Sequence, residues 1–122
     1  MILVDTSVWI DHLHRADPQL TAALEADEVG QHPYVLEELA LGSIPERPRF
    51  LVLLESLRPF PLLSHGELMA LVEARQLWGR GLSAVDAHLI GSVLLAPAGR
   101  LWTRDSRLRS VADECGVPLY AG

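Results

Sequence analysis

The chain has 122 residues, and its 16 acidic and 10 basic residues give a net charge of −6. All ten basic residues are arginine, so the chain contains no lysine. This absence excludes P-loop NTPases, Schiff-base enzymes and phospho-acceptor receiver domains, because each of them needs a lysine ammonium group. The acidic balance also argues against non-specific coating of nucleic acid or adhesion to a membrane surface. Any nucleic-acid partner would therefore be held by local arginines or by a bound metal.

The composition predicts one globular domain. Hydrophobic residues make up 49% of the chain and charged residues 21%, which is normal for a compact fold with a core. The only cysteine, Cys115, cannot form an internal disulfide, and its apolar neighbours favour a buried thiol in a reducing compartment. The first residues lack the basic region of a secretion signal, and no stretch approaches the roughly 20 apolar residues that span a bilayer. We therefore expect a cytoplasmic protein that does not associate with membranes.

The first third of the chain alternates short apolar runs with helical patterns. Residues 2–4 form a continuous apolar run that ends at Asp5, which is typical of a buried parallel strand. Asp17 followed by Pro18 is a favoured helix start. The full pattern predicts a strand at 2–4, a helix capped by Thr6 or Ser7 and running to His14, a helix from Pro18, a short strand at 29–32, and a helix from Pro33 to Gly42.

Two capping boxes mark helices in the second half, since Ser64 is followed three residues later by Glu67, and Ser83 by Asp86. Strands alternate with helices, and the chain has no asparagine for an Asn-Gly hairpin. This order predicts an α/β fold with a mainly parallel sheet flanked by helices. The elements expected are a helix at 50–57, a helix after Ser64 closed by Gly79, a very apolar helix after Ser83, a strand at 101–103, a helix around 108–115 up to Gly116, and a last strand at 117–120.

Three acids stand where a parallel sheet would bring them together. Asp5 and Asp105 follow predicted strands, and Asp86 lies in the first turn of a buried helix. Each could simply cap a helix. However, ligands of such folds bind at the carboxyl ends of the strands, and carboxylates crowded there repel one another unless protons or cations compensate them. Mg²⁺ or Mn²⁺ prefers such oxygen ligands and needs no histidine or cysteine.

Other chemistry finds no support in the sequence. The five histidines have no zinc-type spacing and are interpreted as surface or core residues, and no Gly-x-Ser-x-Gly nucleophile elbow is present. Paired acids also occur at Glu37 and Glu38, but helix phase places them on opposite flanks of the same predicted helix and does not choose between them.

Four blocks of the sequence resemble the PIN-domain ribonucleases, most closely the VapC toxins of type II toxin–antitoxin pairs. The blocks are ILVDTSVWIDHL, EELALG, LSAVDAHLIGSVLL and RLWTRDSRLRSVADECGV. The resemblance extends from Met1 to about Pro118 and is loose between Gly42 and Gly81. It assigns the four family acids to Asp5 after the first strand, Glu38 in the Glu-Leu-x-x-Gly pattern, Asp86 at a helix start, and Asp105 in the Thr-x-Asp pattern.

The resemblance implies a single PIN domain over residues 1–122, with a three-layer α/β/α architecture and a mainly parallel central sheet. It implies a Mg²⁺- or Mn²⁺-dependent endoribonuclease that hydrolyses phosphodiester bonds, often in tRNA or rRNA. It also implies neutralisation by a VapB-type antitoxin, operator DNA bound only through that antitoxin, and a homodimer. The alternative is a PIN-fold module that binds RNA or a partner without cutting. A phosphatase of the haloacid-dehalogenase type is disfavoured because it needs Asp-x-Asp and a lysine, whereas position 7 is Ser.

The expected site has three groups of residues. Asp5, Glu38, Asp86 and Asp105 are the candidate catalytic and metal-binding acids, and Asp5 and Asp86 are expected to be the main ligands. Hydroxyl groups beside these acids are expected to orient them through hydrogen bonds. Arginines near the site could contact RNA phosphates. The hydroxyl candidates are Thr6, Ser7 and Thr103, and the arginine candidates are Arg80, Arg104, Arg107 and Arg109.

Overall fold

The computed structural model describes all residues from 1 to 122 and contains one four-stranded, all-parallel sheet. The strand order is β3-β2-β1-β4, so the first strand of the chain lies inside the sheet. A single bridge from Leu101 to Leu119 extends the β4 side. The strands are β1 (Ile2–Val4), β2 (Val29–Gln31), β3 (Arg58–Pro59) and β4 (Arg100–Trp102).

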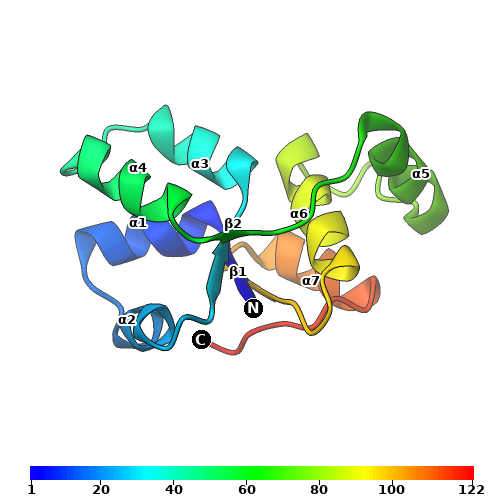
Figure 1. Cartoon of the computed structure of the whole chain (residues 1–122). Helices are drawn as coiled ribbons and strands as arrows, with labels where there is room; N and C mark the ends of the chain where they lie inside the picture. Colours follow the sequence, from blue (N-terminus) through cyan, green and yellow to red (C-terminus); the bar gives the residue numbers. More distant parts are fainter.

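Helices cover both faces of this sheet. Figure 1 shows α1 to α4 gathered on one side and α5 to α7 on the other, which gives the predicted three-layer α/β/α architecture. The longest helix, α6, has 12 residues, and none of the helices has the length and apolar character needed to cross a bilayer. The helices are α1 (Thr6–His14), α2 (Pro18–Glu25), α3 (Pro33–Ala40), α4 (Arg47–Glu55), α5 (His65–Arg75), α6 (Ala84–Leu95) and α7 (Ser106–Glu114).

The order of the strands creates a switch point between β1 and β4. From β1 the chain proceeds to β2 and then β3 on one side, whereas from β4 it proceeds through α7 to the bridge at Leu119 on the other side. Connections that leave neighbouring strands in opposite directions open a crevice at the carboxyl ends of those strands. Residues 5 and 103 therefore stand where ligands of such folds bind.

The core forms around β1. Ile2 and Leu3 are fully buried between the two helical layers, as a continuous apolar strand of a parallel sheet requires. A Cβ atom at Gly30 in β2 would lie 2.6 Å from the ring of Phe60, so glycine lets that ring cover the strand. The thiol of Cys115 is buried, as predicted.

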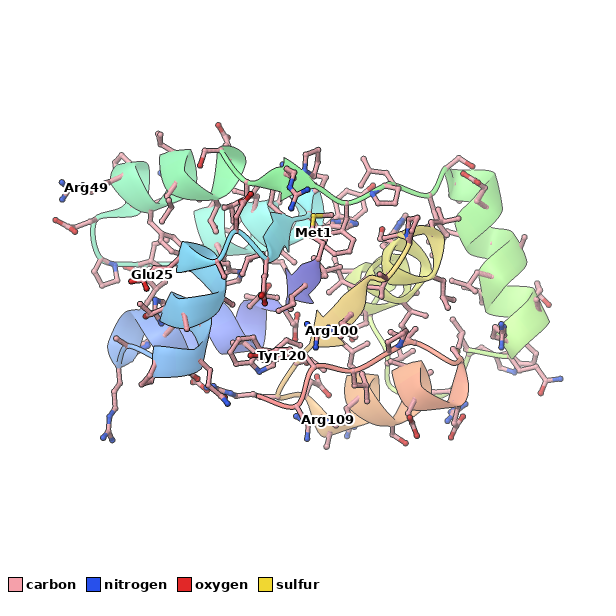
Figure 2. The ribbon with its side chains drawn as sticks, turned by 60° about the horizontal axis from the view of Figure 1, so that its bottom comes forward. Met1, Glu25, Arg49, Arg100, Arg109 and Tyr120 are labelled. Carbon is pink, nitrogen blue, oxygen red and sulfur yellow. The ribbon has the colours of Figure 1, made fainter.

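Aromatic contacts hold the C-terminal segment against β4. The Tyr120 ring lies 4.6 Å from the Trp102 ring, and the Arg100 guanidinium lies 5.0 Å from the centre of the Tyr120 ring. Figure 2 shows Arg100 and Tyr120 next to each other on this side of the molecule. The expected last strand at 117–120 is reduced to the single bridge at Leu119.

One strand was not predicted, and three local expectations differ from the structure in their boundaries or caps. The edge strand β3 was not predicted, because it has two residues and one of them is Pro59. The helix expected at 50–57 already begins at Arg47. Helix α5 ends at Arg75 instead of being closed by Gly79, because Gln76 adopts a left-handed conformation with φ of 53°. Neither Thr6 nor Ser7 caps the first helix, since both lie inside α1 and Asp5 is its N-cap.

Candidate active site

Asp5 is fixed at the end of β1 by three hydrogen bonds to its side chain. Its backbone N–H donates to the Trp102 carbonyl at 2.9 Å, which aligns the ends of β1 and β4. One carboxylate oxygen, Oδ1, accepts from the Thr6 backbone N–H at 2.8 Å. The other, Oδ2, accepts from the hydroxyls of Ser7 at 2.9 Å and Thr103 at 2.7 Å. This buried carboxylate is therefore held in one orientation by groups from both strand ends.

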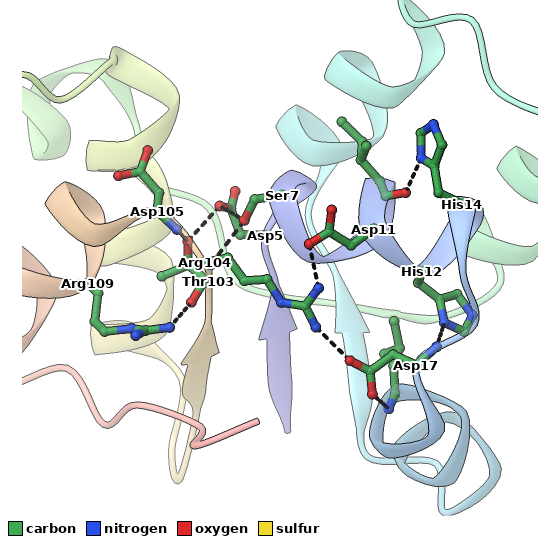
Figure 3. A network of polar contacts seen from close by, with 12 residues as sticks. Asp5, Ser7, Asp11, His12, His14, Asp17, Thr103, Arg104, Asp105 and Arg109 are labelled. Carbon is green, nitrogen blue, oxygen red and sulfur yellow. Dashed lines mark hydrogen bonds and ion pairs between the residues drawn. The ribbon is translucent and has the colours of Figure 1, made fainter.

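The two hydroxyls also accept hydrogen bonds from the loop after β4. Thr103 Oγ1 accepts from the Asp105 backbone N–H, and Ser7 Oγ accepts from the Arg104 backbone N–H, each at 3.1 Å. Figure 3 shows this arrangement at the carboxyl ends of the two strands, with Asp5 and Asp105 at the same edge. Hydroxyl groups that both donate and accept thus connect Asp5 to the segment that carries Asp105.

Asp86 enters the same edge from α6. It belongs to a capping box in which Asp86 Oδ2 accepts from the Ser83 backbone N–H at 3.1 Å and the Ser83 hydroxyl accepts from the Asp86 backbone N–H. Its Oδ1 has no hydrogen-bond donor within the protein. Burial raises the pKa of Asp86 above its ordinary value, and the negative charges of Asp5 and Asp105 raise it further, against the opposing effect of the Ser83 hydrogen bonds. The charges of Asp5 and Asp105 therefore repel that of Asp86 at this edge of the sheet.

Asp105 is the N-cap of α7. Its Oδ1 accepts from the backbone N–H groups of Arg107 at 2.9 Å and Leu108 at 3.2 Å, whereas its Oδ2 has no donor within the protein. The side chain is exposed. Asp105 therefore keeps one carboxylate oxygen available at this edge of the sheet.

Glu38 approaches from α3 and is distinguished from Glu37 by one contact. The Thr6 hydroxyl donates to Glu38 Oε1 at 2.7 Å, next to the backbone N–H that binds Asp5. Glu37 is exposed and makes no side-chain hydrogen bond. The structure thus brings Glu38 to the candidate site, in agreement with the Glu-Leu-x-x-Gly pattern, and leaves Glu37 outside it.

The donor set fits a hard divalent cation, although its side chains are not arranged as a ready-made cage. No three His, Cys, Asp or Glu side chains converge closely enough to hold a metal ion. Asp86, Asp105 and Glu38 each direct one oxygen to a cap or hydroxyl and keep the other free. Free carboxylate oxygens that repel one another are suitable ligands for Mg²⁺ or Mn²⁺. Side-chain rotation would be needed to bring them onto one ion.

Three of the four candidate arginines are already engaged within the protein. Arg104 forms ion pairs with Asp11 at 2.5 Å and Asp17 at 2.6 Å, visible in Figure 3. Arg80 pairs with Glu114, Arg109 donates to the Thr103 carbonyl, and Arg107 makes no ion pair and lies over Gly81. Only Arg107 among the four therefore has a guanidinium without an intramolecular partner.

Sequence reasoning missed the two acids that hold Arg104. Asp17 carries the recognisable cap-then-proline signature of a helix start, and it does cap α2 through its Oδ1. Its second role, and that of Asp11, depends on a residue 87 to 93 positions away in the chain. No local pattern could have revealed that pairing.

A separate apolar groove lies between α1, α2 and α4. Its volume is about 490 Å³, and most of its lining side chains are apolar, including Trp9, Phe50 and the half-exposed Leu53. It contains none of the four candidate acids. This groove therefore differs in chemistry from the carboxylate edge and offers a surface for apolar side chains.

The topology and the acids at the carboxyl ends of the strands agree with the comparison to known protein families. The family model of the PIN domain matches residues 2–114, a range that includes all four acids. The chain belongs to the PIN-domain family.

Within that family, the chain is 58% identical over 119 residues to the protein named Ribonuclease VapC32 from Mycobacterium tuberculosis, in strain CDC 1551 and in strain H37Rv. The alignment covers 98% of this chain and 96% of each relative. The resemblance to VapC-type proteins drawn from the sequence is thereby confirmed.

Proposed function

We propose that this protein is a metal-dependent endoribonuclease of the VapC type that hydrolyses RNA phosphodiester bonds. The observation that carries the proposal is the placement of Asp5, Asp86 and Asp105 at the switch point of the sheet, where burial, and then the charges of Asp5 and Asp105, raise the pKa of Asp86. A sheet edge that brings carboxylates near one another without compensating cationic side chains is suited to bind a divalent cation and, through it, a phosphate. The name of the 58% identical relative supports the same activity.

Each acid has a distinct part in this proposal. Asp5 provides a carboxylate in a fixed orientation. Asp86 provides a free oxygen on a carboxylate that the charges of Asp5 and Asp105 repel. Asp105 and Glu38 complete the set, directly or through water. Thr6, Ser7 and Thr103 keep the carboxylates oriented. Bound Mg²⁺ or Mn²⁺ would supply a Lewis acid that polarises the phosphate and lowers the pKa of a water molecule.

The arginines divide into supporting and substrate-contacting groups. Arg107 is the candidate for a contact with RNA phosphate, because its guanidinium is free beside the first turn of α7. Arg104, Arg80 and Arg109 would reach a phosphate only by giving up their present partners. The phosphate-binding contribution of the chain itself is therefore small, which makes RNA binding dependent on the cation.

The test is an RNA cleavage assay with a matched pair of variants. Glu38→Gln should reduce Mg²⁺-dependent cleavage about 10- to 100-fold, whereas Glu37→Gln should leave it unchanged, because only Glu38 contacts the site. With water as the nucleophile, the products should carry 5′-phosphate and 3′-hydroxyl ends. Cyclic 2′,3′-phosphate ends would contradict hydrolysis by water. Metal-independent RNA binding without cleavage would favour the non-catalytic binding module instead.

A VapB-type antitoxin is the partner that accompanies this proposal. The name of the relative supports it, and the apolar groove between α1, α2 and α4 offers a surface that an amphipathic helix would fit. Operator DNA would be bound only by that antitoxin, and the substrate would be tRNA or rRNA. Co-expression with a VapB-type antitoxin should yield a complex that no longer cleaves RNA, and copurification followed by the same assay measures this.

A homodimer is also proposed. Apolar side chains are exposed on α5 and α6 and on the segments next to these helices, namely Leu62, Met69, Trp78, Leu94 and Leu95. Exposed apolar surface of this kind is a usual feature of protein interfaces. Sedimentation analysis of the isolated chain should give twice the mass of 13.4 kDa.

A further inference from the structure

His32 occupies the third carboxyl end of the sheet. It follows β2 as Asp5 follows β1 and Thr103 follows β4, so these residues stand on three adjacent strands. Its side chain is 1% exposed, which is unusual for a histidine at a sheet edge. The carboxylate chemistry described above makes no use of this buried ring.

The ring of His32 makes two hydrogen bonds that define its tautomer. Nδ1 accepts from the Tyr34 backbone N–H at 3.1 Å and thereby caps α3. Nε2 lies 3.0 Å from the hydroxyl of Ser92, a fully buried residue of α6. Because a neutral imidazole has one N–H and Nδ1 is an acceptor, Nε2 must donate to Ser92 Oγ. Burial lowers the pKa of His32 to about 4, with a smaller effect from His88, so the ring is neutral at physiological pH.

A second contact joins the same two helices. The Tyr34 ring meets the His88 ring edge to face, with 4.7 Å between their centres. Tyr34 lies four residues before Glu38, on the same face of α3, and His88 lies two residues after Asp86 on α6. The side chains that connect α3 to α6 are therefore close in sequence to the acid on each helix.

We propose that His32 is a positioning residue, which sets the separation of the Glu38 and Asp86 carboxylates by capping α3 and hydrogen bonding to Ser92 of α6. The two bonded residues are each six positions from their acid, about 9 Å along either helix. A shift of one helix relative to the other at this link moves the two carboxylates apart. The inference rests on the proposed function, because separation of the two acids matters only where they act together.

The test removes the link without removing the cap. Ser92→Ala keeps the bond from Tyr34 to His32 and loses only the bond between helices. Relative to wild type, this variant should bind Mn²⁺ about 10- to 100-fold more weakly by calorimetry and show a similar decrease in kcat, with an unchanged KM for RNA. In His32→Gln, the amide nitrogen can take the place of Nε2 and bond to Ser92. This variant should retain more of the wild-type Mn²⁺ affinity than His32→Asn, which can keep only the bond that caps α3.

Val93→Ala provides the control for a merely structural effect. Val93 is buried in α6 next to Ser92, and its apolar side chain cannot take part in the hydrogen bonds of the link, so this variant should lower the melting temperature while leaving Mn²⁺ affinity and kcat unchanged. If Ser92→Ala behaves like Val93→Ala in both readouts while the wild type binds Mn²⁺ and cleaves RNA, the inference is wrong and the proposed function stands. If the wild type neither binds Mn²⁺ nor cleaves RNA, the proposed function is wrong and the inference fails with it.

Discussion

Asp5 and Asp86 are the same chemical group in two opposite settings at one edge of the sheet. Asp5 is buried and accepts three side-chain hydrogen bonds, from Thr6, Ser7 and Thr103. Asp86 is half-buried, accepts one, and has its pKa raised, first by burial and then by the charges of Asp5 and Asp105. The fold therefore fixes one carboxylate regardless of any ligand and leaves the other with repulsion that a cation would relieve.

The difference originates in the donors. Asp5 is bound by groups from both α1 and the end of β4, so its geometry depends on tertiary structure. Asp86 is bound only by Ser83 of its own capping box, so its geometry is local. A preorganised ligand beside an adjustable one allows a site to keep its shape while it accepts an ion.

The largest effect is expected from Asp5→Asn. RNA cleavage should fall more than about 100-fold, because even groups that only orient ligands contribute 10- to 100-fold. The new amide would direct donors at the Ser7 and Thr103 hydroxyls, which now donate to Asp5. Loss of these buried bonds should lower the free energy of unfolding by about 1–3 kcal/mol, measured by urea denaturation. A variant as stable as the wild type would show that Asp5 is not fixed by these bonds.

Asp86→Asn should reduce cleavage as strongly but affect stability in the opposite direction. The raised pKa of Asp86 means that the stability gained from its protonation is fully present below its ordinary pKa of 3.8 and is lost as the pH rises through the raised value. At neutral pH in EDTA the variant should therefore melt at a higher temperature than the wild type, and the difference should disappear below pH 3.8. Mg²⁺ should raise the melting temperature of the wild type more than that of the variant, and equal shifts would contradict the comparison.

Thr103→Val tests whether the hydroxyl bridge supports Asp5. The valine removes the donor to Asp5 Oδ2 and the acceptor for the Asp105 N–H. Cleavage should decrease about 10- to 100-fold, with weaker Mn²⁺ binding measured by calorimetry. Thr103→Ser keeps the hydroxyl and should retain most of the activity. A Thr103→Val variant that retains its activity while Thr103→Ser loses it would mean that the methyl group, and not the hydrogen bond, is what matters.

The smallest effect is expected from Arg104→Gln. The ion pairs to Asp11 and Asp17 are partly exposed, with the Arg104 side chain 34% accessible, so their loss should cost less than about 1 kcal/mol. The backbone bond from Arg104 to Ser7 remains, and cleavage should change little. A loss of activity as large as that of Thr103→Val would show that this guanidinium leaves its ion pairs to act on RNA.

Much of the fold could be predicted because its determinants are local. The apolar run of β1 and the capping boxes at Ser64 and Ser83 are short sequence patterns, and the structure contains the strand and both capping boxes. The strand β3 could not be predicted, since the pairing of Arg58 and Pro59 with β2 depends on the tertiary fold and not on a local pattern. The end of α5 depends on a left-handed conformation at Gln76, and glutamine, unlike glycine, is not a residue that predicts this conformation.

In the candidate site too, features with local determinants could be predicted, whereas contacts between distant segments could not. The positions of Asp5, Asp86 and Asp105 could be predicted from strand ends and caps. The choice of Glu38 over Glu37 came from the family resemblance, and the contact with Thr6 explains it physically. The ion pairs of Arg104 and the link between His32 and Ser92 join segments far apart in the chain, and no periodicity in the sequence encodes such encounters.

The hydrogen bond between Asp5 and Thr103 joins residues 98 positions apart, at the two strands that lie on either side of the switch point. During synthesis β1 leaves the ribosome before its β4 neighbour exists, because β4 comes after all the other strands in the chain. A growing chain that has not yet reached β4 therefore carries Asp5 and Asp86 but lacks Asp105 and the Thr103 hydroxyl that orients Asp5. Whatever reaction this edge performs, it has to wait until the segment that carries Thr103 and Asp105 has been made.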